Sequence, residues 1–66
     1  MDKWRFKQLL EKSGYAVDSE AAIPTVLLVG ATNEEIKKKF FEVKLLAQKT
    51  GYHHSVAVRS LEENNE

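Results

Sequence analysis

The chain of 66 residues contains no cysteine. Disulfides and thiolate metal ligands are therefore excluded. Domains of fewer than about 70–80 residues often gain stability from disulfides, a structural metal or oligomerisation. Oligomerisation is the route that this composition leaves open, and the absence of cysteine is compatible with a reducing compartment.

Long hydrophobic runs are also missing. No segment approaches the ~20 apolar residues of a membrane-spanning helix. Residues 1–5 alternate charged and apolar side chains, without the apolar core of a signal peptide. We therefore expect a cytoplasmic protein without membrane contact.

Neither sign of charge is in excess, since ten basic residues balance ten acidic ones. This balance differs from the strongly basic composition of a dedicated nucleic-acid-binding domain. Residues 21–60 carry six basic and three acidic residues, whereas residues 61–66 carry three acids and no base. The pattern predicts one compact domain over residues 1–60 and an acidic, disordered tail over residues 61–66.

The periodicity of apolar residues predicts two helices. The first covers residues 2–13, with an apolar stripe and a stop at Ser13 and Gly14. The second covers residues 32–50, where Thr32 and Glu35 have the spacing of a capping box. Gly51 marks its end.

Two strands are expected around the second helix. Residues 26–29 are apolar throughout, as in an inner strand covered on both faces. Residues 55–59 alternate, with Val56 and Val58 on one side. The expected fold is a small single α/β domain of order α-β-α-β, whose two- or three-stranded sheet contains a βαβ unit and is packed by two helices. Residues 15–17 are the candidate for a third strand, either between the other two or at an edge.

The second helix has two apolar sides. Phe41 and Leu45 form a pair four residues apart that points roughly opposite to the main stripe. The main stripe, which we expect to face the core, consists of Ile36, Phe40, Val43 and Ala47. Either the first helix covers Phe41 and Leu45 within the monomer, or a second subunit or protein partner does.

Trp4 lies outside the apolar stripe of the first helix, among Lys7, Gln8 and Glu11. Tryptophan is enriched at the centres of interfaces because it buries a large area with few rotamers to restrict. The alternatives are a frayed first turn or an indole that folds over the edge of its own core. We retain the hypothesis that Trp4 contacts a partner.

These observations favour a non-enzymatic protein-interaction module, an accessory or regulatory protein that forms a homodimer or binds a protein partner. Trp4, Phe41 and Leu45 are its candidate interaction residues. Catalysis is not expected, because the serines have no nucleophile-elbow context and the carboxylates show no sign of a buried pair. A chain of this size also has little volume for a pocket.

The alternative function is weak nucleic-acid binding through basic side chains. The candidate residues are Lys37, Lys38, Lys44, Lys49 and Arg59. Three consecutive lysines splay around a helix, which is typical of a solvated face rather than of one binding stripe. Any such binding would be strongly salt-dependent.

No metal or cofactor is expected. His53 and His54 are adjacent, so on an extended segment they point to opposite faces and cannot both ligate one ion. The turn at residues 30–33 lacks the glycines of a nucleotide-binding loop, and Glu34 and Glu35 place negative charge where a phosphate would bind.

Overall fold

The structure, a computed structural model, describes residues 1–62. Its elements are α1 (Lys3–Lys12), β1 (Ala16–Val17), β2 (Thr25–Val29), α2 (Asn33–Thr50) and β3 (Ala57–Leu61). The predicted α/β domain with two helices and a small sheet is confirmed. Its element order is α-β-β-α-β rather than α-β-α-β, because the candidate segment at residues 15–17 does supply a strand.

The three strands form one sheet in the order β1-β2-β3. β2 and β3 are parallel, with Val26 opposite Val58, so β2, α2 and β3 form the predicted βαβ unit. β1 pairs antiparallel with the other side of β2, at the edge of the sheet. The predicted tail does not begin at residue 61, because Leu61 pairs with Val29 in β3. Residues 63–66 lie outside the described part of the chain.

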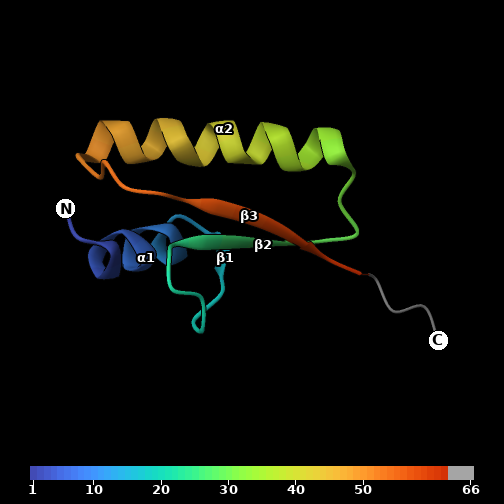
Figure 1. The fold of residues 1–66 in the computed structure, drawn as a ribbon, viewed down its shortest axis with the longest axis horizontal. Coiled ribbons are helices and arrows are strands. Elements are labelled where there is room, and N and C mark those ends of the chain that lie inside the picture. Colours follow the sequence, from blue (N-terminus) through green and yellow to red (C-terminus); the bar gives the residue numbers. More distant parts are fainter. Residues whose placement is uncertain (63–66) are drawn as a thin grey trace.

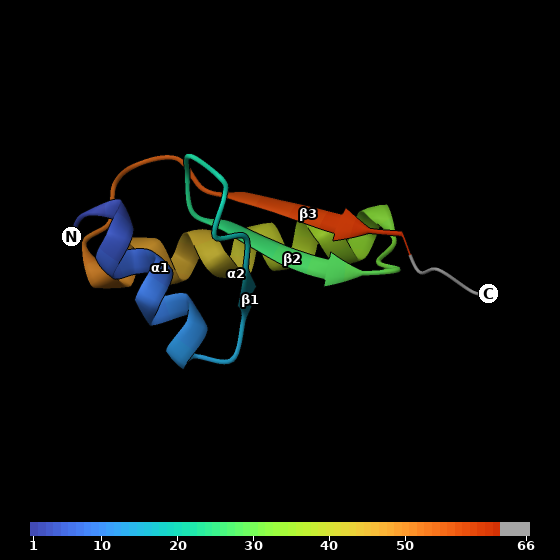
Figure 2. The ribbon, with the colours of Figure 1, turned by 90° about the horizontal axis from the view of Figure 1, so that it is seen from below.

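α2 runs along one face of the sheet, and α1 lies beside the beginning of β2 (Figures 1 and 2). Sheet and α1 therefore occupy the same side of α2. The ends of α2 are capped as its sequence predicts, whereas the N-cap of α1 is Asp2, which the predicted helix of residues 2–13 included. Asp2 accepts a hydrogen bond from Arg5 N, and Thr32 and Glu35 form the reciprocal capping box. Gly51 adopts the left-handed conformation that ends α2, with φ of 84°.

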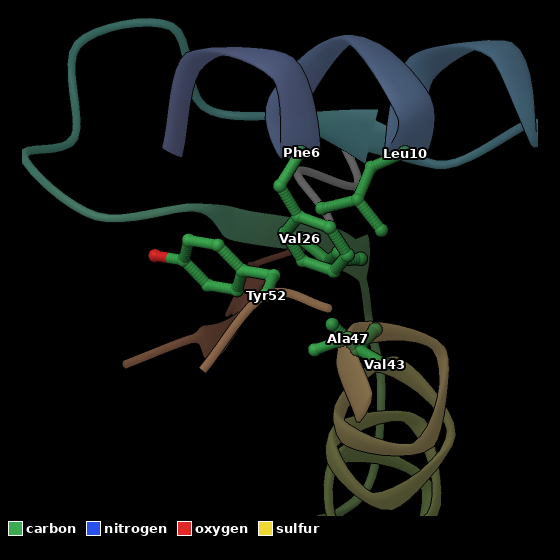
Figure 3. Packing of buried hydrophobic residues seen from close by; sticks show 6 residues of the cluster. All are labelled: Phe6, Leu10, Val26, Val43, Ala47 and Tyr52. Carbon is green, nitrogen blue, oxygen red and sulfur yellow. The ribbon is translucent and has the colours of Figure 1, made fainter. Parts of the chain in front are cut away.

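The core lies between α1, the start of β2 and the C-terminal half of α2 (Figure 3). Its buried members are Phe6, Leu10, Val26, Val43, Ala47 and Tyr52. Tyr52, which the sequence analysis did not place in the core, stacks on Phe6 with ring centroids 4.6 Å apart and planes 4° apart. Its hydroxyl donates to Ser55 O over 3.0 Å.

The predicted core stripe of α2 is only partly buried. Val43 and Ala47 are in the core, Ile36 is half-buried, and Phe40 remains 37% exposed. The core is therefore concentrated at the C-terminal end of α2.

The expectation that β2 is covered on both faces is wrong. Val26 faces the core, so Leu27 and Val29 point to the opposite side of the sheet. α2 covers the other face of the sheet, α1 lies beside the start of β2 (Figure 2), and Val29 at the end of β2 is 68% exposed. An apolar strand sequence therefore reflects the central position of β2 in the sheet but not a second covering layer.

We expect the Tyr52 ring to be essential for folding and its hydroxyl to be secondary. Tyr52→Ala removes the ring stacked on Phe6 and should cost about 3–5 kcal/mol of unfolding free energy, comparable with the whole stability of so small a core. Tyr52→Phe loses the hydrogen bond to Ser55 O and should cost about 0.5–1.5 kcal/mol. Urea denaturation followed by circular dichroism measures both. Equal losses in the two variants would contradict the packing role of the ring.

Candidate functional site

Two large apolar side chains stand on the outer side of α2. Phe41 is 64% exposed and Leu45 is 45% exposed. We call these two residues the α2 ridge. The interpretation in which the first helix covers them within the monomer is therefore wrong, and the second apolar side of α2 has no cover in residues 1–62.

Helix geometry explains why α1 does not reach the ridge. Phe6 and Leu10 of α1 point towards the side of α2 that carries Val43 (Figure 3). Phe41 and Leu45 are each two residues from Val43, and two residues turn a helix through about 200°. The ridge therefore faces away from α1 and from the sheet.

A shallow depression of about 320 Å³ adjoins the ridge. It is lined by Ser13, Tyr15, Glu42, Leu45, Leu46 and Lys49. The Tyr15 hydroxyl donates to Glu42 Oε1 over 2.7 Å, and Lys39 Nζ lies 3.2 Å from Glu42 Oε2. Lys39 Nζ also lies 5.3 Å from the centre of the Tyr15 ring. These contacts give the ridge a polar border on one side.

The same contacts shift two titrations. The hydrogen bond to Glu42 raises the pKa of Tyr15 above its ordinary value of 10.0, with smaller contributions from burial and from the carboxylate charge. The hydrogen bond from Tyr15, followed by that from Lys39, lowers the pKa of Glu42 below its ordinary value of 4.5. Both shifts favour the pair of a neutral phenol and a charged carboxylate at neutral pH.

Trp4 belongs to a different surface. Its side chain is 66% exposed, and it lies two residues from the buried Phe6, so it points away from the core. Trp4 and the α2 ridge are on different helices, and each points away from the buried residues of its own helix. The three predicted interaction residues are all exposed, but the structure does not bring them into one patch.

The five basic residues proposed for nucleic-acid binding do not share one surface either. Arg59 points to the side of the sheet away from α2, where its Nη1 lies 3.4 Å from Asp18 Oδ2. Lys44 Nζ lies 5.7 Å from the centre of the Phe40 ring. The remaining candidates, Lys37, Lys38 and Lys49, are exposed around α2.

A larger hollow, of about 810 Å³, was not found by the sequence analysis. It lies where the loop before β2 and the segment before β3 meet α2, and we call it the loop hollow. It includes Ile23, Phe40, Lys44, His53, His54 and Val56 in its lining. The hydrogen bond from Ala57 N to Pro24 O, 2.9 Å long, holds the two segments side by side. The lining comes from four separate segments that no periodicity or motif relates, so no sequence signal could have indicated this hollow.

Within residues 1–62, no group of three or more histidine, aspartate or glutamate side chains is placed to hold a metal ion. No helix in this part of the chain is long and apolar enough to span a bilayer. Comparisons with protein-family models, with curated proteins and with solved structures find no match. Function is therefore inferred from the surfaces alone.

We expect Glu42→Ala to lower the pKa of Tyr15 towards its ordinary value, because the variant removes both the hydrogen-bond acceptor and the nearby charge. A spectrophotometric titration of the two tyrosines measures the change, with Tyr52 as internal reference because burial alone raises its pKa. Glu34→Ala, in the same helix, is the matched control and should leave the titration unchanged. An unchanged Tyr15 titration in Glu42→Ala would contradict the hydrogen bond.

The pair also predicts how stability varies with pH. The lowered pKa of Glu42 contributes stability that is present above pH 4.5 and is lost as the pH falls through the lowered value. The raised pKa of Tyr15 contributes stability that is present below pH 10.0 and is lost as the pH rises through the raised value. In Glu42→Ala both losses should be smaller in thermal unfolding scans across pH.

Proposed function

We propose that this protein is a non-enzymatic, self-associating interaction module that forms a homodimer through the α2 ridge. The observation that carries the proposal is the exposure of Phe41 and Leu45 on a helix whose opposite side is already in the core. A small domain with one thin core gains stability when a second copy covers such a surface.

The size of the ridge indicates a weak dimer. Full burial of a Phe or Leu side chain contributes about 1.5–3 kcal/mol, and a symmetric interface buries four such side chains that are already partly covered. Burial of these side chains then contributes roughly 3–7 kcal/mol to association. The loss of translational and rotational freedom costs at least about 4 kcal/mol. Contacts from flanking residues must add to the ridge, and we expect a dissociation constant in the micromolar range or above.

The charges of α2 support a second copy in antiparallel orientation. Glu34 and Glu35 lie in the first turn and Lys49 in the last turn. An antiparallel pair brings acidic and basic ends together and opposes the helix dipoles, whereas a parallel pair brings like charges together. This arrangement is why we favour a homodimer over an unrelated partner.

The titratable side chain that is buried within residues 1–62, Tyr52, packs on Phe6 and donates its hydroxyl to Ser55 O, so it serves the core. The buried polar residue is Thr25, whose hydroxyl donates to Ile23 O. In this proposal the protein acts in the cytoplasm as an accessory or regulatory protein. Trp4, which lies on α1, serves a contact separate from the dimer. Nucleic-acid binding is less well supported, because Arg59 is paired with Asp18 and separated from the lysines.

We expect Phe41→Gln/Leu45→Gln to give a folded monomer, because both side chains are exposed and the core does not need them. Sedimentation equilibrium over a wide concentration range should show a dimer for the parent chain and at least a tenfold weaker association for the variant, as expected when more than about 1.4 kcal/mol of interface energy is lost. Circular dichroism checks the fold.

Val29→Gln is the matched control, because it removes an equally exposed apolar side chain from the sheet surface. It should leave the association unchanged. A parent chain that stays monomeric at every concentration would refute self-association, and an effect of Val29→Gln equal to that of the ridge variant would refute the site.

A further inference from the structure

The loop hollow combines an apolar floor with a cationic border. Phe40 and Ile23 contribute the floor and are 37% and 38% exposed, and the half-buried Val56 lies between them in the lining. The Tyr52 ring closes the floor from the core side, and its hydroxyl is already bonded to Ser55 O. The floor therefore offers hydrocarbon and few free polar groups.

The border carries two lysines, Lys3 and Lys44, and two histidines, His53 and His54. The carboxylate in the lining, Asp2, is engaged at the start of α1, where its Oδ1 accepts from Arg5 N over 2.8 Å. Positive charge therefore exceeds negative charge around the hollow, although the chain as a whole is neutral.

Lys44 joins the two parts of the site. Its ammonium lies 5.7 Å from the centre of the Phe40 ring, so a cation stands directly at the margin of the apolar floor. A ligand with an anionic head and an apolar body can contact both at once. The volume of about 810 Å³ falls in the range of small-molecule sites.

We propose that the loop hollow binds a small monocarboxylate with an apolar body, with the carboxylate at Lys44 and Lys3 and the body on Phe40, Ile23 and Val56. The charge complementarity of the border selects the anionic head, and the floor selects the apolar body. This proposal goes beyond the dimer and does not depend on it, because the ridge residues Phe41 and Leu45 do not line the hollow.

The test compares three eight-carbon probes of equal length: octanoate, octan-1-ol and octylammonium. Amide chemical-shift changes in the ¹⁵N-labelled protein locate and quantify the binding of each probe. We expect octanoate to bind with a dissociation constant on the order of 1 mM, given its ten non-hydrogen atoms, and to shift the amides of residues 22–23, 40–44 and 53–56. The alcohol and the amine should bind about tenfold more weakly or worse, because they lack the charged hydrogen bond.

Two matched pairs of variants separate this site from the dimer. Lys44→Gln and Phe40→Ala should weaken octanoate binding about tenfold, with circular dichroism confirming the fold. Lys49→Gln and Phe41→Ala, the same changes at residues of α2 that do not line the hollow, should leave octanoate binding unchanged. Sedimentation equilibrium on the same four proteins shows whether the dimer is affected independently.

Three outcomes would overturn the proposal. They are equal binding of octanoate and octan-1-ol, octanoate shifts outside the hollow, and equal losses in Lys44→Gln and Lys49→Gln. Loss of dimerisation in Phe41→Ala with intact octanoate binding would support both proposals separately, and a monomeric parent chain that still binds octanoate would leave only the hollow.

Discussion

The stacking of Tyr52 on Phe6 joins α1 to the segment that follows α2. As a helix, α1 is not hydrogen-bonded into the sheet. It is held by the side chains of Phe6 and Leu10, which are buried in the core. Tyr52 can meet Phe6 because Gly51 reverses the chain after α2, with the Tyr52 amide bonded to Ala47 O over 2.8 Å. The left-handed conformation of Gly51 and the stacking of Tyr52 on Phe6 thus determine the position of the core.

The exposed surfaces follow from this placement. The core occupies the C-terminal half of α2, where Val43 and Ala47 face α1 and the sheet. The opposite side of the same helix is left to Phe41 and Leu45, and the stretch towards the N-terminus leaves Phe40 at the floor of a hollow. A single helix therefore presents a covered side, an uncovered apolar ridge and the wall of a potential ligand site.

The local elements could be predicted from the sequence, because their signals are short-range. The capping box at Thr32, the stop at Gly51 and the apolar run of β2 each lie within a few residues, and all three were confirmed. The core position of Tyr52 could not be predicted, because it depends on contact with Phe6, 46 residues away in sequence. The sequence left open whether the first helix covers Phe41 or leaves it exposed. Periodicity gives the direction of each side chain around a helix, but it does not show which neighbouring element packs against that side.

The loop hollow and the one-sided sheet lay beyond sequence reasoning for a related reason. Both depend on how separate segments meet: the hollow on the loop before β2 lying against the segment before β3, and the exposed end of β2 on α1 packing beside the start of the strand rather than along it. The sequence of β2 is apolar throughout, and such a sequence occurs whether one or both faces of a strand are covered. The exposure of Val29 shows that one face is open at the end of β2.

Arg59 gives β3 a further property. In the described part of the chain β3 is an edge strand, and edge strands are templates on which sheets of different molecules join. Arg59 is at the centre of this five-residue strand, so antiparallel pairing of two copies in register about it would set two guanidinium groups opposite each other. The two like charges disfavour joining of sheets through this edge.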